Sequence, residues 1–359
     1  MNHPEKGKKM KTTILSRGEI SQGKGYHGWP TVIRTKENEL LAVCSGGRRG
    51  HVCPFGRLYL YRSVNNGLSW HGPEILSQGP LDDRDAGICQ ATDGSILVNY
   101  FTSTCAFFNE KWAKEAEAIS LRTLKKEHGF WMRRSVDGGK SFLEKYSVPV
   151  SSPHGPTLLQ DGRLFYVGEC LDPAAVVQRG WRRCKGTIAC ALSRDNGESW
   201  EMISDLPSPE GHLPSECYEP YGIQAPDGRW IVQIRVQSED SALGAKTWQT
   251  ESGDEGKSWS CPHIVCDGFP THLLRLPKDL LLMTYGWRNS SPYGIRARLS
   301  LDSARTWEEE EIMLADDAPN IDVGYPSTAQ LKDGSLFTLY YQAGEERATL
   351  KYCRWTLEL

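Results

Sequence analysis

Three absences limit what this chain of 359 residues can be. The charges nearly balance, with 42 Lys and Arg against 45 Asp and Glu, so we expect no basic face for a nucleic acid. No run of about 18 apolar residues occurs, so we expect no membrane-spanning helix. The N-terminal stretch MNHPEKGKKMKTT has no apolar segment behind it and is not a secretory signal, which predicts a cytoplasmic protein.

Paired cysteines and metal motifs are also missing. The chain has 11 cysteines, an odd number, and no C-x-x-C pair. Four of them fall in apolar, strand-like runs, where a buried reduced thiol is expected: Cys44, Cys89, Cys190 and Cys353. No motif has the spacing of metal ligands, so we expect neither a metal nor another cofactor.

An eight-residue motif, S-x-D-x-G-x-[ST]-W, recurs five times. The copies read SVNNGLSW, SVDGGKSF, SRDNGESW, SGDEGKSW and SLDSARTW, and they begin at Ser63, Ser135, Ser193, Ser252 and Ser300. The starts are 72, 58, 59 and 48 residues apart, so a unit of about 59 residues would repeat about six times.

Each unit has the pattern of a four-stranded antiparallel sheet. An apolar run with a turn of the Asp-Gly kind precedes an alternating run, the motif and a further short strand. The prediction is an all-β fold, a six-bladed β-propeller forming a single domain over residues 1–359. The last unit lacks the motif, and a strand near 11–17 would complete its blade, whereas we expect residues 1–10 to be disordered. An insertion in the second blade, 105–128, carries a stretch that favours a short helix, 113–126.

The motif itself is expected to be a structural turn, an Asp-box. Its Asp accepts hydrogen bonds from turn amides, its Gly allows a positive φ, and its aromatic residue anchors the hairpin between sheets. A calcium loop would need several oxygen ligands, and each copy offers a single recurring carboxylate.

Aligning the units on the turn that follows their first strand brings polar residues to one level. The residue nine positions before the glycine of that turn is Asp85, Glu219 or Tyr325 in three different units. Arg235 lies sixteen residues after Glu219, at the far end of the next strand. Because the first strand of each blade lines the central funnel, these side chains are candidates for one site.

The five boxes and this constellation resemble the sialidase (neuraminidase) superfamily, whose catalytic domains are six-bladed propellers with such boxes. The box similarity covers essentially the whole chain, and it is more specific for the fold than for the function. The resemblance implies a tyrosine nucleophile with a glutamate partner. It also implies an arginine triad for the carboxylate of sialic acid and an aspartate acid/base in a mobile loop.

Carried over to this sequence, the resemblance assigns five residues. Tyr325 matches the nucleophile and Glu219 its partner, while Arg235 matches the second arginine of the triad. Asp85 matches an aspartate that holds substituents of the sugar. Arg48, in SGGR, matches an arginine after the second strand of the first blade.

Four departures from the family pattern are plain. Gly28 in HGWP occupies the place of the first triad arginine, and the loop 48–57 has no carboxylate. The third arginine is not at its expected place, although Arg288 and Arg296 lie close by. The glutamate that often closes the second strand of the last blade is replaced near residues 340–342.

Histidines are candidates for the missing acid. His51 lies in the loop that lacks the aspartate, and an imidazole can donate a proton near neutral pH. His27 lies at the mouth of the first strand, and His154 and His272 also fall near strand entrances.

The leading hypothesis is a retaining exo-glycosidase that releases sialic acid or a related acidic sugar. Tyr325 would be the nucleophile, Glu219 its base and His51 the acid/base, with Arg235 and Arg288 binding the carboxylate. Asp85, Arg48 and His27 would contact the sugar. One alternative is a hydrolase or lyase for polysaccharides that contain uronic acid; another is a propeller that binds glycans without cleaving them.

Overall fold

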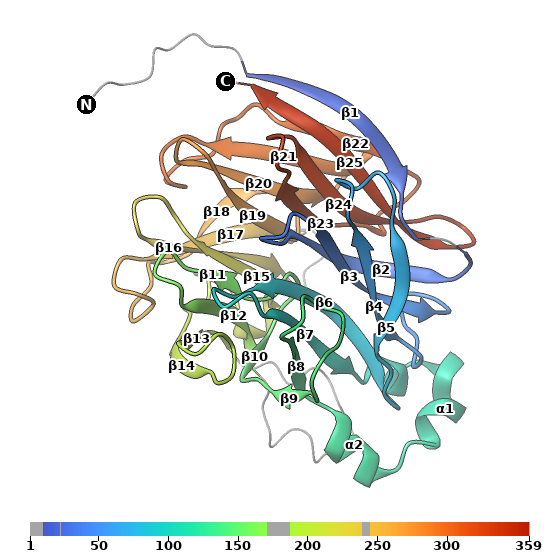
Figure 1. Cartoon of the computed structure of the whole chain (residues 1–359). Helices are drawn as coiled ribbons and strands as arrows, with labels where there is room; N and C mark the ends of the chain where they lie inside the picture. Colours follow the sequence, from blue (N-terminus) through green and yellow to red (C-terminus); the bar gives the residue numbers. More distant parts are fainter. Residues whose placement is uncertain (1–9, 22, 171–186, 239–244, 359) are drawn as a thin grey trace.

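The computed structural model describes residues 10–21, 23–170, 187–238 and 245–358. These residues form an all-β structure in which antiparallel sheets follow one another along the chain in a propeller-like arrangement (Figure 1). The segment 1–10, for which disorder is expected, lies outside the described residues except for Met10. No helix in the described ranges has the length and apolar character needed to cross a membrane.

Twenty-five strands make up the sheets. The first group is β2 (Tyr26–Arg34), β3 (Leu40–Arg48), β4 (Arg57–Ser63) and β5 (His71–Ser77). The second is β6 (Asp82–Gln90), β7 (Ile96–Ser103), β8 (Phe130–Ser135) and β9 (Tyr146–Ser147). The third is β10 (Val150–Ser151), β11 (Thr157–Leu158), β12 (Leu164–Cys170), β13 (Ile188–Ser193) and β14 (Glu201–Asp205). 

The remaining strands form three groups of four. They are β15 (Cys217–Gln224), β16 (Trp230–Gln237), β17 (Ala245–Ser252) and β18 (His263–Cys266), preceded by the short 3-10 helix η4 (Pro214–Glu216). Next come β19 (Thr271–Leu276), β20 (Leu280–Trp287), β21 (Tyr293–Ser300) and β22 (Ile312–Ala318). The last are β23 (Val323–Gln330), β24 (Leu336–Ala343), β25 (Ala348–Glu358) and β1 (Lys11–Glu19).

The hydrogen-bonding pattern joins two of these six groups, so the described residues form five sheets. The first and last groups share one eight-stranded sheet through a single parallel pair, Tyr26 with Ala348. The Ala348 amide donates to the Gly25 carbonyl at 3.1 Å, which makes the link. The all-β, propeller-like prediction is confirmed, whereas six fully separate sheets are not observed.

The N-terminal strand completes the last group, as predicted. Strand β1 pairs antiparallel with β25 from Lys11 opposite Glu358 to Glu19 opposite Lys351. The two strands therefore lie side by side although they come from opposite ends of the chain (Figure 1). This pairing covers an edge that would otherwise present unpaired backbone groups.

The repeated motif forms the expected turn. In the third copy, Ser193 Oγ donates to Asp195 Oδ1 at 2.8 Å and accepts from the Gly197 amide at 2.8 Å. Asp195 Oδ1 also accepts from the Ser199 amide at 2.9 Å. The corresponding bonds recur at Asn65, Asp137, Asp254 and Asp302. The side-chain oxygens at the Asp position thus accept hydrogen bonds within their own turn, which supports the interpretation of the motif as a structural turn.

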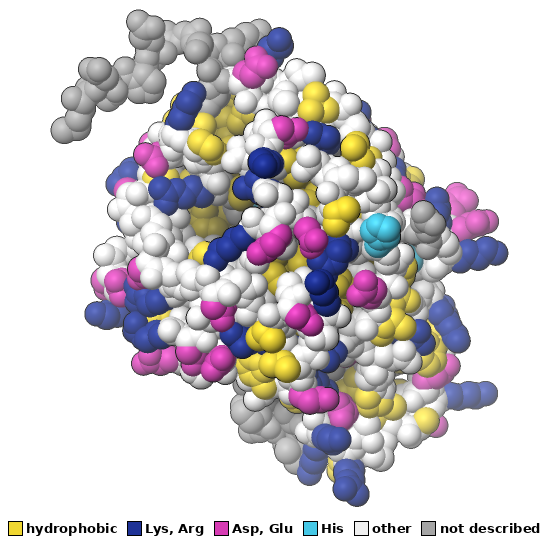
Figure 2. Space-filling model, viewed as in Figure 1, with side chains coloured by type: hydrophobic (Ala, Val, Ile, Leu, Met, Phe, Trp, Pro, Cys, Tyr) yellow, Lys and Arg dark blue, Asp and Glu magenta, His cyan; other side chains and the backbone are white. Residues whose placement is uncertain are grey.

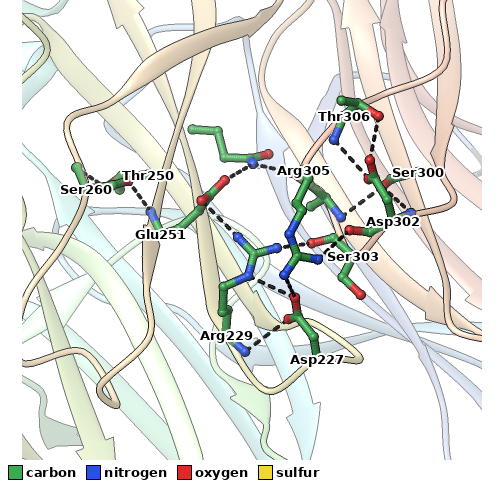
Figure 3. A network of polar contacts seen from close by, with 12 residues as sticks. Asp227, Arg229, Thr250, Glu251, Ser260, Ser300, Asp302, Ser303, Arg305 and Thr306 are labelled. Atoms are coloured by element: carbon green, nitrogen blue, oxygen red, sulfur yellow. Dashed lines mark hydrogen bonds and ion pairs between the residues drawn. The ribbon is translucent and has the colours of Figure 1, made fainter.

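The boxes also tie neighbouring sheets together. In Figure 3, the turn of the fifth box meets the first hairpin turn of the preceding sheet: Arg229 Nη2 donates to the Ser303 carbonyl at 2.7 Å, and Arg305 pairs with Asp227 at 2.8 Å. Trp259 of the fourth box lies against Phe165 of the third group, with ring centroids 6.4 Å apart. Figure 2 shows acidic and basic side chains interspersed on the visible face.

The insertion between β7 and β8 is helical, but it consists of several helices that are each shorter than the predicted one. It contains η1 (Cys105–Phe108), η2 (Glu110–Trp112), α1 (Ala113–Glu117) and α2 (Leu121–Glu127). One helix over 113–126 does not form, because Ser120 caps α2 by accepting from the Thr123 amide at 3.0 Å. Trp112 Nε1 donates to the Val52 carbonyl at 2.9 Å and anchors the insertion to the first group's β3–β4 loop.

The four cysteines that were predicted to be buried and reduced are buried and form no disulfide with another described residue.

Candidate active site

The first strands of several groups share a backbone irregularity. Trp29, Asp85, Glu219 and Tyr325 have φ of 55°, 50°, 48° and 51°, values that residues other than glycine seldom adopt. At each of these positions the register with the next strand shifts. A bulge of this kind re-aims a side chain and is common beside active sites. The three residues that their spacing from a hairpin turn placed at one level, Asp85, Glu219 and Tyr325, therefore occupy equivalent bulged positions in their strands.

A cavity of about 350 Å³ lies at this level. Three arginines and three carboxylates are on its wall: Arg84, Arg235, Arg288, Asp85, Glu169 and Glu219. The ends of the helical insertion also reach it, through Thr104, Cys105 and His128. Its size suits one sugar unit, and its lining suits a charged one.

Tyr325 and Glu219 are brought together from strands 106 residues apart in the chain. The Tyr325 hydroxyl donates a short hydrogen bond to Glu219 Oε1, while Arg235 Nη1 donates to the other oxygen, Oε2, at 2.8 Å. Burial raises the pKa of Tyr325 well above its ordinary value, Glu219 and Asp85 raise it further, and Arg235 and Arg288 oppose them. The phenol is therefore neutral at rest, and its proton has an acceptor already in place.

Arg288 belongs to the same cavity wall. Its Nε donates to the Val323 carbonyl at 2.6 Å and its Nη2 to the Tyr341 hydroxyl at 2.7 Å. Its guanidinium carbon lies 5.7 Å from the centre of the Tyr325 ring. Arg296, the other arginine considered, instead pairs with Glu311 at 2.6 Å and is absent from the wall of this cavity.

His51 lines the cavity and is held by a residue that the sequence did not single out. Its Nδ1 lies 3.2 Å from Asp322 Oδ1 and 2.9 Å from the Tyr26 hydroxyl. Tyr341 and Tyr26 also donate to Asp322, at 2.7 and 2.9 Å. Burial raises the pKa of Asp322, but the hydrogen bonds and charge of its neighbours, led by His51, hold it below its usual value. An ionised Asp322 favours a proton on Nδ1 of His51, which leaves Nε2 for chemistry.

Two of the predicted sugar contacts, Arg48 and His27, lie away from the wall of the cavity. Arg48 is 1% exposed, makes a two-pronged ion pair with Asp82, and also donates to the His51 carbonyl at 2.7 Å. It supports the loop that carries His51 and is absent from the cavity wall. His27 is also buried off the cavity, against Tyr59, and burial lowers its pKa to about 4.

Two residues that the sequence analysis missed lie beside Asp85. Arg84 lines the cavity, and its guanidinium carbon lies 4.0 Å above the Trp29 ring. Trp29 is nine residues before Asn38, the positive-φ residue of the first hairpin turn, so the same alignment would have found it. Arg84 had only its adjacency to Asp85 as a signal.

The other two candidate histidines are buried together away from the cavity wall. His154 and His272 have ring centroids 5.1 Å apart, and His272 stacks on Tyr221 at 4.8 Å. Burial lowers the pKa of His154 to about 3, so both rings are neutral. Among the described residues, no three or more His, Cys, Asp or Glu side chains are grouped to hold a metal ion.

The fold and cavity define a class: a box-bearing propeller with a charged central site. A family model for the BNR repeat-like domain matches residues 118–338, more than half of the chain. The chain belongs to this family, within the sialidase/BNR superfamily.

Individual relatives are distant. A sialidase of Bacteroides fragilis (strain YCH46) is 22% identical over 320 residues, which cover 78% of this chain and 53% of the relative. The chain thus spans about half the length of that curated relative. A protein of unknown function from Dyadobacter fermentans superposes with a TM-score of 0.77 at 22% identity, covering 97% and 99% of the two chains. The intramolecular trans-sialidase of Ruminococcus gnavus, solved with oseltamivir carboxylate, gives 0.68 at 12% identity, covering 93% and 95%. These likenesses show a shared fold.

Proposed function

We propose that this protein is a retaining exo-glycosidase that releases sialic acid or a closely related acidic sugar. The observation that carries the proposal is the Tyr325–Glu219–Arg235 chain of hydrogen bonds on the wall of a cavity the size of one sugar. A tyrosine held by a carboxylate and a guanidinium is the arrangement that an anionic sugar requires. A neutral phenol does not repel the substrate's carboxylate, as an aspartate nucleophile would.

In the first step, the Tyr325 oxygen attacks the anomeric carbon while Glu219 takes the phenol proton. His51 donates its Nε2 proton to the leaving oxygen as the glycosidic bond breaks. In the second step, neutral His51 takes a proton from water, which attacks the anomeric carbon and releases the Tyr325 oxygen. That oxygen regains its proton from Glu219, so the enzyme returns to its starting state.

Positioning groups surround these three. Arg235 and Arg288 face the cavity and bind the sugar carboxylate, and Asp85 binds polar substituents on the ring. Asp322 orients His51 and stabilises its protonated form. We further propose that the eight-stranded sheet acts as two blades, which gives a single domain of six blades around the cavity.

The test is turnover of an aryl sialoside compared with an aryl uronide. We expect the sialoside to be cleaved, with retention at the anomeric carbon seen by NMR in the first product. Tyr325→Phe should lower kcat by on the order of 10³-fold or more, because the nucleophile is gone. Tyr61→Phe is the matched control: its buried hydroxyl has no hydrogen-bond partner among the described residues and lies off the cavity.

Three results would reject the proposal. Full turnover by Tyr325→Phe would show that Tyr325 is not the nucleophile. An unsaturated product that absorbs ultraviolet light, formed from the uronide, would favour a lyase. Tight binding of the sialoside without any product would favour a glycan-binding propeller.

A further inference from the structure

Of the three described arginines on the cavity wall, Arg84 makes no hydrogen bond or ion pair with a described residue, whereas Arg235 and Arg288 do. It lies on β6, one residue before the bulge at Asp85, and is 8% exposed. No hydrogen bond or ion pair within the described residues engages its guanidinium, and its Nε is buried without a partner. The side chain nevertheless forms part of the cavity wall.

The neighbouring arginines make direct pairs through their Nη atoms, although the Nε atoms of Arg48 and Arg235 are also buried without a partner among the described residues. Arg48 pairs with Asp82, with one Nη2–Oδ2 distance of 3.1 Å. Arg235 pairs with Glu219 at 2.8 Å and donates to Gln237 at 2.6 Å. Arg288 donates to a carbonyl and a phenol. The described part of the chain therefore supplies direct partners to these three guanidinium groups and none to the guanidinium of Arg84.

Trp29 fixes Arg84 in this unpaired position. The guanidinium carbon lies 4.0 Å from the indole centroid, and the indole is itself 1% exposed. Stacking satisfies the face of a guanidinium but not the N–H groups in its plane. Those donors remain for a planar acceptor.

The charge on Arg84 persists despite burial. Burial lowers the pKa of Arg84, but the nearby charges of Asp85 and Asp82 raise it, and the net result is above the usual value. Asp82 already binds Arg48, so it does not neutralise a second guanidinium completely. A buried charge without a direct partner is costly, and a fold keeps one where a ligand completes it.

We propose that Arg84 is an anion-binding residue of the cavity and takes the carboxylate of an acidic sugar. A carboxylate matches the in-plane donors of a guanidinium two by two, and the cavity volume of about 350 Å³ limits the ligand to about one sugar unit. The identity of the sugar rests on the proposed function, whereas the anion site itself does not. Arg84 then binds this carboxylate together with Arg235 and Arg288, which the proposed function also places there.

The experiment compares two ligands that differ only in charge, sialic acid and its carboxamide, by calorimetric titration. Wild-type protein should prefer the acid by about 10- to 100-fold, the range expected for a charge-assisted pair. Arg84→Met should lower this ratio by about tenfold, because Arg235 and Arg288 remain, and should leave carboxamide binding within about threefold. Arg84→Lys should keep part of the preference. Arg49→Met is the matched control, because Arg49 also stacks on an aromatic ring, 4.6 Å from Phe55, but does not line the cavity.

A thermal-shift series tests the site without any sugar. Sodium acetate, compared with sodium chloride at equal ionic strength, should raise the Tm of the wild type and not that of Arg84→Met. The variant's own Tm should stay within about 2 °C of the wild type, because no ion pair between described residues is broken.

The outcomes separate the site from the proposed function. If neither sugar binds but acetate stabilises only the wild type, the anion site stands and the sugar assignment fails. If Arg84→Met keeps the acid preference, or its Tm falls by several degrees while the preference persists, the proposal is overturned and the glycosidase assignment stands. A larger shift with sulfate than with acetate would overturn the carboxylate assignment.

Discussion

The Asp-box turns and the central cavity use the same types of side chain under opposite conditions. In the boxes, each carboxylate is bonded within its own turn: hydrogen bonds from Ser258 and Ser252 lower the pKa of Asp254 to about 2. In the cavity, polar groups come from distant strands: burial raises the pKa of Tyr325 well above its ordinary value, and nearby carboxylates raise the pKa of Arg84 despite its burial. The box carboxylates are at least partly exposed and have their hydrogen bonds within the turn, whereas the cavity groups are largely buried and include Arg84, which has no ion pair among the described residues.

This difference separates stability from chemistry. A satisfied local carboxylate has nothing left to offer a ligand, so a box holds sheets together and does little else. Strained backbone and an unpaired Arg84 cost free energy and are retained at the level where a substrate would bind. Changes in the cavity should therefore affect activity far more than stability, and changes in the boxes should do the reverse.

After Tyr325→Phe, the largest effect of a change in the cavity should come from His51. We expect His51→Gln to lower kcat/KM by about 10²-fold or more on a sialoside with a sugar leaving group, because general acid catalysis is lost. A nitrophenyl leaving group departs without help, so the same variant should lose less than about tenfold on that substrate. His263→Gln, at an exposed strand position, is the control.

Asp322→Asn should reproduce this pattern more weakly, since Asp322 positions His51 and does not touch the substrate. Equal losses on both leaving groups for His51→Gln would mean that the imidazole is not the acid. The glycosidase assignment would survive that result.

A change in a box should lower the stability of the protein and leave its activity nearly unchanged. Asp195→Ala removes the acceptor for Ser193, Ser199 and the turn backbone, and should lower the free energy of unfolding by about 1–2 kcal/mol in urea titrations. Activity at 25 °C should stay within about twofold. Asp195→Asn is the control, because Asn65 makes the same bonds in the first box, and it should cost less than about 0.5 kcal/mol. A large loss of activity with unchanged stability would break the division between the two regions.

The smallest effect should distinguish, by pH, a histidine buried outside the cavity from a box carboxylate. His154 has an unfolded pKa of about 6.5 and a folded pKa of about 3, so the unfolded chain binds the extra proton and stability falls as pH drops between these values. The folded state instead favours the charged form of Asp254. Its contribution to stability is present above about pH 3.8 and is lost as the pH falls towards about 2.

His154→Asn should therefore flatten the loss of stability between pH 6.5 and about 3, and asparagine suits the φ of 69° at this position. Asp254→Asn should change only the lower range. Urea titrations at pH 7, 5 and 3.5 separate the two. Identical pH dependence in wild type and His154→Asn would show that this histidine is not held neutral by the fold.

The sequence by itself determined the repeating architecture. The five boxes, the hairpin turns and the strand near Lys11 were legible because turn chemistry and strand alternation act over a few residues. The same spacing located Asp85, Glu219 and Tyr325 at one level, since equal distances from a turn place residues equally along equivalent strands. It could not foresee that Tyr26 and Ala348 join the first and last groups into one sheet.

Only the tertiary structure decided which charges meet. Arg48 was expected at the cavity, but Asp82, 34 residues away, holds it inside the protein. His51 meets Asp322 across 271 residues because a loop of the first group bends towards the last one. Arg84 has no ion pair among the described residues, and Trp29, on a neighbouring first strand, stacks on its face. Such pairings depend on loop paths and burial between strands far apart in the chain, for which no local pattern exists.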